Sequence, residues 1–323
     1  MPTGPTGVLI QPYTAIRDTK PTQSSPFGTP TGQLCLFTAY SKLKDTWTSS
    51  ILWWTSSTSR ASSRYGTCTA VRPTVWWEYF SNRSQSWRKL FDPSLGFIRG
   101  KDSKGNFRKE YSPFSSSHRA DDYCEGNGWQ YTWLVPHDFN GLCKCFGGKE
   151  KLLEKLDKLF TVSSVVEGEE TSPDISGLIG QYAHGNEPSH HILYFYTIAG
   201  QPWKTADRVR QVVSELYHAA PDGLSGNEDV GQMSAWYILS NLGFYEVEPG
   251  SGRYWFGTPL MDRAEIAVPG GTFTIIAREL SDKNRYVQKV FLNGKAYTKS
   301  YIPHSDIAAG GELLFVMGRE QSW

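Results

Sequence analysis

Three stretches of the sequence bring carboxylates, amides and histidines together with aromatic side chains. They are Asp121–Tyr131, Gly180–His191 and Gly226–Gln232. Each places a carboxylate beside small residues that leave room for a ligand, and each has amides able to hydrogen-bond hydroxyl groups. Two carboxylates that flank a sugar, one protonated and one ionised, are what the hydrolysis of a glycosidic bond requires. The three stretches therefore predict a carbohydrate-active site.

Two of these carboxylates also have a simpler explanation. Glu125 could be a solvated charge on a loop, and Asp229 could cap the helix expected to start beside it. The residues alone leave both alternatives open.

The second stretch contains side chains that could bind a metal ion. His184 and the pair His190–His191 could suggest zinc, but their spacing is not HExxH and oxygen ligands crowd the same stretch. Asn186 and Glu187 supply oxygens of the kind that Ca²⁺ prefers. The residues therefore favour calcium over zinc.

Helical patterns alternate with the polar stretches in the middle of the chain. Apolar residues recur at helical spacing over Lys149–Phe160, and again over Thr205–Tyr217, where Thr205 is a good N-cap. A third helix is expected over Asp229–Gly243, since a glycine suits the position just after a helix. Helices joined by such loops predict an all-helical toroid with the loops gathered at one end.

The pattern changes to strands after Pro249. Alternating or apolar runs occur at Ala264–Val268, Phe273–Ala277 and Leu313–Met317. Another run leads into Asn293-Gly294, the strongest short hairpin signal. These runs predict a small antiparallel β module, so the fold class expected for the chain is α+β.

Composition narrows the function classes further. The formal net charge of +1 over 323 residues gives no sign of a nucleic acid or anionic membrane partner. No apolar run approaches the length of a membrane span, and the first residues lack the pattern of a signal peptide. Five cysteines, an odd number with no CxxC pair, argue against a disulfide framework or a zinc ribbon.

Residues 1–77 differ in composition from the rest of the chain. They contain no Glu, only two Asp, and 25 Ser and Thr, together with the pairs Trp53-Trp54 and Trp76-Trp77. A Ser/Thr-rich disordered linker is one interpretation, but tryptophans are unusual in disordered segments. Reading the back-translated segment one base earlier gives strings with balanced charge and helix-like spacing. We therefore expect residues 1–77 to be an out-of-frame translation without a native fold.

The motifs resemble glycoside hydrolase family 92, the calcium-dependent exo-α-mannosidases. The strings that carry this resemblance are Glu125–Asp138, Gly177–His191, Ala199–Thr205 and Pro221–Gly250. The resemblance covers about residues 78–323. It implies an inverting hydrolysis of α-linked mannose, a secreted or periplasmic location, and Ca²⁺ bound at the subsite of the departing mannose. It also implies an N-terminal β-sandwich domain followed by an (α/α)6 toroid, with the active site between them.

The resemblance assigns roles to individual residues. Glu125 is expected to be the general acid, Asp229 the base, and Asn186 and Glu187 calcium ligands. An inverting pair of carboxyl groups should lie roughly 6.5–9.5 Å apart to admit a water molecule. The family often has a second Asp two residues before the base, where this chain has Asn227. The residues expected to bind substrate are Asn127, Trp129, Gln130, His137 and Gln232.

We therefore expect residues 78–247 to form an incomplete (α/α)6 catalytic toroid and residues 248–323 the β module. The expected partner is a mannose-containing glycan, of N-glycan or mannan type. Because the chain lacks the sandwich and the first toroid helices, we expect a fragment that folds poorly or is inactive. Two alternatives remain: a non-catalytic carbohydrate-binding fragment and a toroid glycosidase with another sugar specificity. Linkage preference and oligomeric state are left open.

Overall fold

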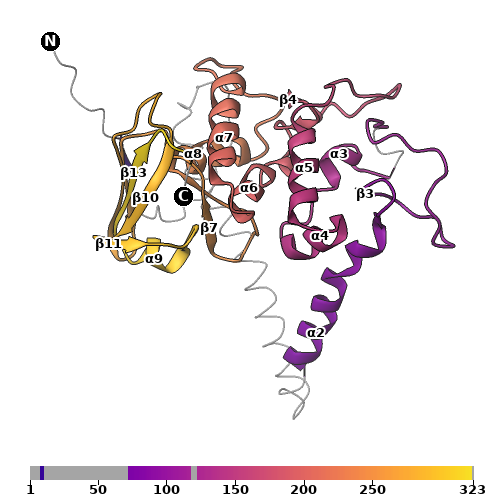
Figure 1. The fold of residues 1–323 in the computed structure, drawn as a ribbon, viewed down its shortest axis with the longest axis horizontal. Coiled ribbons are helices and arrows are strands. Elements are labelled where there is room, and N and C mark those ends of the chain that lie inside the picture. The colour runs from indigo at the N-terminus through magenta and orange to yellow at the C-terminus, as the bar shows by residue number, and fades with distance from the viewer. Residues whose placement is uncertain (1–7, 11–71, 118–121, 322–323) are drawn as a thin grey trace, which may run out of the picture. The chain divides into compact units, whose positions relative to one another are not determined.

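The computed structural model describes residues 8–10, 72–117 and 122–321, with side chains from residue 77 onward. The described residues divide into two compact units, drawn together in Figure 1. Unit 1 contains residues 8–10, 190–224 and 232–321, and unit 2 contains the rest. Most of the segment for which an out-of-frame translation was expected lies outside the described residues, and only 8–10 and 72–77 of it are described.

Unit 2 is built from helices and short hairpins. Its helices are α2 (Arg72–Ser84), η1 (Ser86–Leu90), α3 (Gly128–Tyr131), α4 (Phe139–Phe146), α5 (Lys149–Leu159) and η2 (Glu187–Ser189). Its strands pair as β2 (Phe91–Asp92) with β3 (Phe97–Ile98), and as β4 (Leu178–Ile179) with β5 (Tyr182–Ala183). The amphipathic helix predicted from Lys149 is confirmed as α5, which buries its leucines: Leu152, Leu153, Leu156 and Leu159.

Unit 1 begins with helices. They are η3 (Ile192–Tyr194), α6 (Phe195–Ile198), α7 (Pro202–Leu216) and α8 (Gln232–Leu242), with α9 (His304–Ala308) later in the chain. The prediction that Thr205 caps α7 is wrong, because the helix starts at Pro202, whose fixed φ suits the first helical position. Thr205 is instead fully buried and donates a hydrogen bond to Leu193 O at 2.9 Å. Gly243, with φ +97°, follows α8 as predicted.

Two sheets complete unit 1 (Figure 1). The larger has the order β1-β8-β9-β13-β10-β11, and the smaller has the order β12-β7-β6. The strands of the larger sheet are β1 (Val8–Ile10), β8 (Arg263–Val268), β9 (Gly271–Arg278), β10 (Tyr286–Leu292), β11 (Lys295–Tyr297) and β13 (Gly311–Gly318). Those of the smaller sheet are β6 (Phe244–Glu246), β7 (Arg253–Phe256) and β12 (Tyr301–Pro303). The predicted runs are confirmed as strands β8, β9, β10 and β13.

The β module is not antiparallel throughout, which corrects the prediction. β8 with β9, β10 with β13 and β10 with β11 are antiparallel pairs, but β9 and β13 are parallel. Parallel neighbours need a long crossover connection, and residues 279–310 supply it. The predicted hairpin turn is confirmed, since Asn293 and Gly294 have φ values of +51° and +74°, as a type I′ turn requires.

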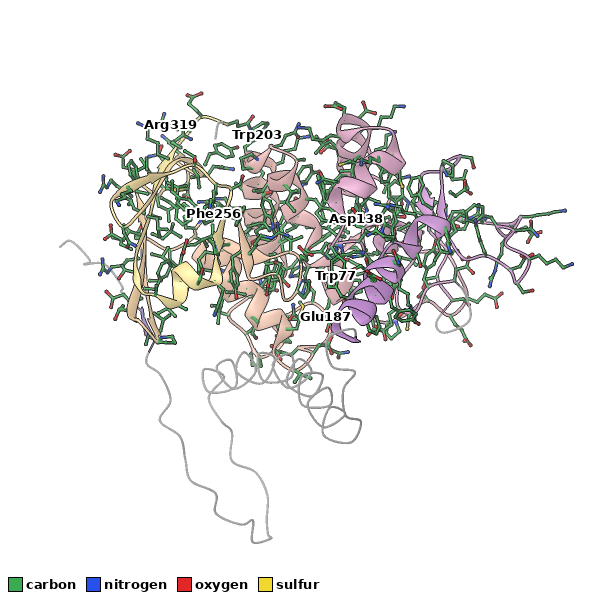
Figure 2. All side chains as sticks on the ribbon, turned by 90° about the horizontal axis from the view of Figure 1, so that it is seen from below. Trp77, Asp138, Glu187, Trp203, Phe256 and Arg319 are labelled. Atoms are coloured by element: carbon green, nitrogen blue, oxygen red, sulfur yellow. The ribbon has the colours of Figure 1, made fainter. Side chains whose placement is uncertain are left out.

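An aromatic core holds the β module together. Phe256, Phe273 and Phe315 are fully buried, and the rings of Phe256 and Phe315 meet edge to face at 5.3 Å. Figure 2 labels Phe256 among the side chains of unit 1. Burial of each such side chain contributes about 1.5–3 kcal/mol. Helices combined with sheets confirm the α+β class. Within the described ranges, no helix is long and apolar enough to cross a membrane.

Candidate active site

The residues predicted to catalyse hydrolysis all belong to unit 2. Glu125 precedes α3, Asn186 and Glu187 follow the β4–β5 hairpin, and Asp229 lies in the segment Ser225–Gly231. The fold therefore brings the three predicted stretches into one compact unit, except for the ends of the last two, His190–His191 and Gln232, which belong to unit 1.

The start of α3 fixes the backbone next to Glu125. Asn127 is the N-cap, and its side chain accepts a hydrogen bond from Trp129 N at 3.0 Å. Gln130 completes a capping box by accepting from Asn127 N at 2.7 Å. Glu125 N donates to Tyr131 Oη at 3.2 Å. The backbone that carries the half-buried Glu125 is therefore fixed by contacts with residues of the short helix.

Gln181 ties this segment to the β4–β5 hairpin. Asn127 Nδ2 donates to Gln181 Oε1 at 2.9 Å, and Gln130 Nε2 donates to Gln181 O at 2.7 Å. The Gln181 amide in turn donates to Ser163 O at 2.7 Å. Each of the three bonds is at least partly buried, so the clamp is shielded from water. Gln181 lies in a predicted stretch but was not singled out, because a glutamine carries no signal of such a clamp.

A second link joins the first two stretches. Asn186 Nδ2 donates to Glu125 O at 2.9 Å. The residue predicted to bind calcium therefore touches the backbone of the residue predicted to be the general acid.

Glu187 is the carboxyl group that the other negative charges of the site influence. Burial raises the pKa of this half-buried carboxyl above its ordinary value, and the negative charges of Asp229, Glu125 and Asp174 raise it further. Glu125 and Asp229 therefore both lie close enough to Glu187 to influence its carboxyl group. Such clusters of interacting carboxylates are typical of functional sites. Asp174 was missed because it precedes the predicted stretch, in a Ser-Pro-Asp segment typical of a turn.

Asp229 occupies a strained backbone position. Its φ is +52° and that of Val230 is +57°, in the left-handed region that non-glycine residues rarely adopt. A β-branched residue in this region is an outlier, and such strain is concentrated at functional sites. An N-cap residue has an extended backbone and directly precedes its helix, whereas α8 begins at Gln232. The structure thus gives no support to the helix-cap explanation of Asp229.

The aromatic residue predicted to bind substrate is packed inside unit 2. Trp129 is 5% exposed. Its ring meets Phe97 edge to face at 5.1 Å and lies 5.9 Å from the ring of Phe114. The Lys155 ammonium group lies 4.4 Å from the Trp129 ring centre. These contacts make Trp129 a support for the α3 segment, and its contact with a sugar stays a prediction.

The other predicted substrate residues are divided between the units. Asn127 and Gln130 are buried in the bonds described above. His137 is exposed, with Nε2 2.9 Å from Ser84 O at the end of α2. Gln232 belongs to unit 1, where its Nε2 lies 3.1 Å from His190 Nδ1 and donates to Tyr245 Oη at 3.0 Å. Their roles in binding substrate stay predictions as well.

The donor chemistry around Asn186 and Glu187 suits a hard cation. Because the Asn186 amide nitrogen donates to Glu125 O, its Oδ1 is the amide atom with lone pairs for a ligand. Burial raises the pKa of Glu187 most, and the neighbouring negative charges add a repulsion that a bound cation would relieve. No group of three or more His, Cys, Asp or Glu side chains in the described ranges could hold a metal ion. A calcium site here would thus also need amide, backbone or water oxygens, which Ca²⁺ accepts.

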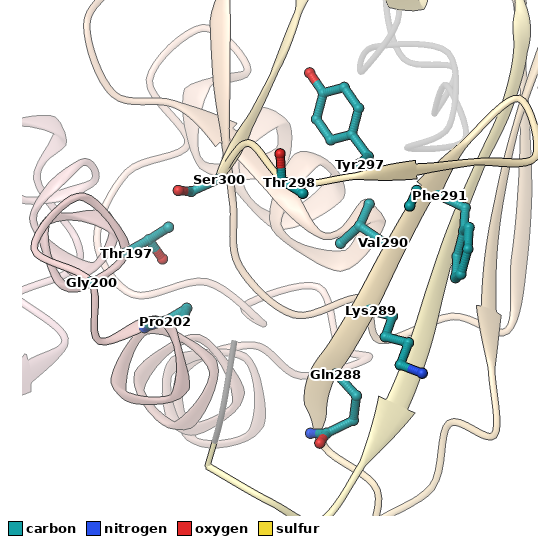
Figure 3. Close-up of a pocket in the computed structure, with 11 residues that line it drawn as sticks. Thr197, Gly200, Pro202, Gln288, Lys289, Val290, Phe291, Tyr297, Thr298 and Ser300 are labelled. Carbon is teal, nitrogen blue, oxygen red and sulfur yellow. The ribbon is translucent and has the colours of Figure 1, made fainter.

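Unit 1 contains a cavity with different chemistry (Figure 3). Its volume is about 410 Å³, and it lies between the turn from α6 to α7 and strands β10 and β11. Its lining contains no carboxylate or imidazole: Thr197, Gly200, Pro202, Gln288, Lys289, Val290, Phe291, Ala296, Tyr297, Thr298 and Ser300. The cavity therefore lacks the acid and base that glycoside hydrolysis needs.

Comparison with known proteins decides the family. Residues 68–319 match the sequence model of the glycosyl hydrolase family 92 catalytic domain. The chain belongs to glycosyl hydrolase family 92. This membership confirms the resemblance drawn from the motifs and the assignment to the glycoside hydrolases.

Similar proteins include solved structures and one curated sequence. A family 92 α-mannosidase from Bacteroides thetaiotaomicron, solved with mannoimidazole, is 40% identical, with a TM-score of 0.70 over 76% of this chain and 33% of that one. A family 92 inverting mannosidase from the same organism is 34% identical, with a TM-score of 0.65 over 75% and 34%. An uncharacterized secreted glycosidase of Arthroderma benhamiae is 28% identical over 76% of this chain and 33% of the relative. The chain thus spans about a third of the length of these relatives.

Proposed function

We propose that this chain carries the acid–base machinery of an inverting, Ca²⁺-dependent exo-α-mannosidase that removes terminal α-linked mannose from glycans of N-glycan or mannan type. The observation that carries the proposal is the meeting of Glu125, Glu187 and Asp229 in unit 2, where the charges of Glu125 and Asp229 both act on Glu187. The similar family 92 α-mannosidase supports mannose as the sugar, and the similar inverting mannosidase supports the stereochemistry.

In an inverting hydrolysis, Glu125 would act as the general acid and Asp229 as the general base. Glu125 gives its proton to the glycosidic oxygen as the bond from that oxygen to C1 breaks. Asp229 takes a proton from a water molecule, whose oxygen bonds to C1 on the opposite face of the ring. The tether of Glu125 to α3 and Asn186, and the fixed backbone at Asp229, hold the two groups ready before substrate binds.

Asn186 and Glu187 would hold the calcium ion in this proposal. When bound, Ca²⁺ supplies a positive charge that orients mannose hydroxyls and helps to distort the ring. Glu187 must be ionised to act as a ligand, so calcium binding should weaken as the pH falls.

The proposal extends to the architecture and the location. We place the helices of residues 78–247 in part of an (α/α)6 toroid, with residues 248–323 as the following β module, and we regard the chain as a fragment of a longer enzyme. The family match begins at residue 68, and α2 spans Arg72–Ser84, so both cross the expected boundary at residue 78. The out-of-frame reading of residues 1–77 stays a prediction. The secreted relative supports a secreted or periplasmic location.

Release of mannose from an α-mannoside by the purified chain, with Ca²⁺ present, tests the proposal, and it would refute the expectation from the sequence that the chain is poorly folded or inactive. Glu125→Gln and Asp229→Asn should each lower kcat by at least about 100-fold, while Glu154→Gln, an exposed carboxylate on α5, should leave it unchanged. A chelator should reduce turnover, and added Ca²⁺ should restore it. Binding of mannose without turnover in the wild-type chain would favour a non-catalytic carbohydrate-binding fragment. Faster release of glucose than of mannose would favour a glycosidase of another specificity.

A further inference from the structure

Ser176 lies between glycines of the two segments that carry Glu187 and Asp229. A Cβ atom added to Gly185 would collide with Ser176 Oγ, and one added to Gly226 would lie 2.6 Å from the same atom. Gly185 lies two residues before Glu187, and Gly226 lies three residues before Asp229. The Ser176 hydroxyl therefore occupies the gap between the two segments.

Backbone hydrogen bonds join Ser176 and Gly177 to the segment that carries Glu187. Gly185 N donates to Ser176 O at 3.0 Å, and His184 N donates to Gly177 O at 3.1 Å. On the other side, a Cβ on Gly177 would lie 2.7 Å from Ser225 Cβ. The segment Ser225–Gly231, which carries Asp229, thus packs directly on the residues that flank the β4–β5 hairpin. Neither Gly177 nor Gly185 leaves enough space there for an added methyl group.

The Ser176 hydroxyl acts here by its size. Its oxygen is buried and has no hydrogen-bond partner among the described residues. A buried hydroxyl without a partner costs free energy, so the side chain gains nothing from polarity in this position. Its remaining contribution is to fill the gap and so to fix the separation of the two segments.

We propose that Ser176 is a positioning residue that sets how closely the Asp229 segment approaches the hairpin carrying Glu187. Its effect on catalysis rests on the proposed function, because Asp229 there aligns the attacking water. Its effect on geometry rests only on the packing described above.

Gly185→Ala is the sharpest probe of this role. Gly185 has no left-handed backbone, so alanine strains the site only by contact, chiefly with Ser176 Oγ and with Ser225 O at 2.9 Å. Displacement of Asp229 by about 1 Å should lower kcat roughly 100-fold, with KM nearly unchanged. The double variant Ser176→Ala/Gly185→Ala removes the colliding oxygen, so it should regain at least about tenfold of the lost kcat.

A second readout does not depend on turnover. Urea denaturation followed by circular dichroism reports how well the two segments pack, and Gly185→Ala should lower the denaturation midpoint because the added methyl group collides with Ser176 Oγ. The double variant should move the midpoint back toward the wild-type value.

The two readouts separate the possible failures. A Gly185→Ala variant with wild-type kcat and denaturation midpoint, or a double variant that restores neither, would overturn the positioning role. A wild-type chain that releases no mannose would refute the proposed function, and the denaturation series alone would then decide the role of Ser176. If Gly185→Ala does not fold, as judged by circular dichroism, Ser176→Thr adds a methyl group to the same gap and should shift the same two quantities.

Discussion

Asn127 caps α3 and hydrogen-bonds Gln181 with the same side chain, and it is fully buried. The resemblance to family 92 marked the residue, but the sequence could not show where its amide would lie. The same holds for Trp129, whose ring is packed against Phe97. At the scale of single residues, the sequence located the chemically important segments. It did not distinguish the side chains that support the site from those that would contact a sugar.

Asn127→Ala should therefore destabilise the fold. It removes the N-cap of α3, worth about 1 kcal/mol, and leaves Gln181 Oε1 without its partner in a buried setting, which costs about 1–3 kcal/mol more. Urea denaturation followed by circular dichroism should show a loss of about 2–4 kcal/mol. Asn140→Ala, an exposed asparagine on α4, is the control and should change stability by less than about 0.5 kcal/mol. Equal losses for the two variants would contradict the account of the clamp.

Glu187 should make the stability of the calcium-free chain depend on pH. Because its pKa is raised in the folded state, the unfolded chain ionises first as the pH rises above the ordinary value of 4.5, and folded stability then falls. Glu187→Gln removes this loss, so its Tm should exceed that of the wild type near neutral pH and match it at lower pH, where both forms are uncharged.

The control for the Glu187 prediction is Glu154→Gln, which replaces an exposed carboxylate on α5. Its Tm should follow that of the wild type across the whole pH range. A Glu187→Gln variant with the same pH dependence as the wild type would show that burial and the neighbouring charges do not raise the pKa of Glu187.

At the scale of elements, periodicity predicted the helices and strands better than it predicted their ends and partners. The spacing of the leucines was sufficient to predict α5, and the pair Asn293-Gly294 was sufficient to predict the β10–β11 turn. Pro202 is a better helix start than Thr205, yet a buried threonine and a capping threonine look alike in sequence. The parallel pairing of β9 with β13 could not be predicted, because strand order depends on how a long connection crosses the sheet.

Phe315→Ala tests the role of β13 at the centre of the larger sheet. The ring of Phe315 is fully buried against Phe256, so its loss should leave a cavity and cost about 3–5 kcal/mol in the free energy of unfolding. Thr272→Ala, an exposed position on the neighbouring strand β9, should cost much less. Guanidinium denaturation of both variants provides the measurement, and a loss below about 1 kcal/mol for Phe315→Ala would show that this core contributes little.

At the scale of the whole molecule, the sequence could suggest that the three predicted stretches form one site, but only the structure brings them together in one unit. Glu125, Glu187 and Asp229 are separated by up to about a hundred positions in the sequence. Their electrostatic contact depends on the Gln181 clamp and on the glycine packing around Ser176. Spacing along the chain carries no signal of either.

The stereochemistry of the released sugar tests the central claim most directly. Proton NMR can follow the first minutes of hydrolysis of an α-mannoside by this chain in the presence of Ca²⁺, before the product anomers equilibrate. The account predicts that β-mannose appears first, because Asp229 activates a water that attacks the face opposite the departing group. First appearance of α-mannose would contradict the assignment of Glu125 and Asp229 as an inverting pair, and no release of mannose would contradict the proposal that this chain hydrolyses mannosides and would favour the inactive fragment expected from the sequence.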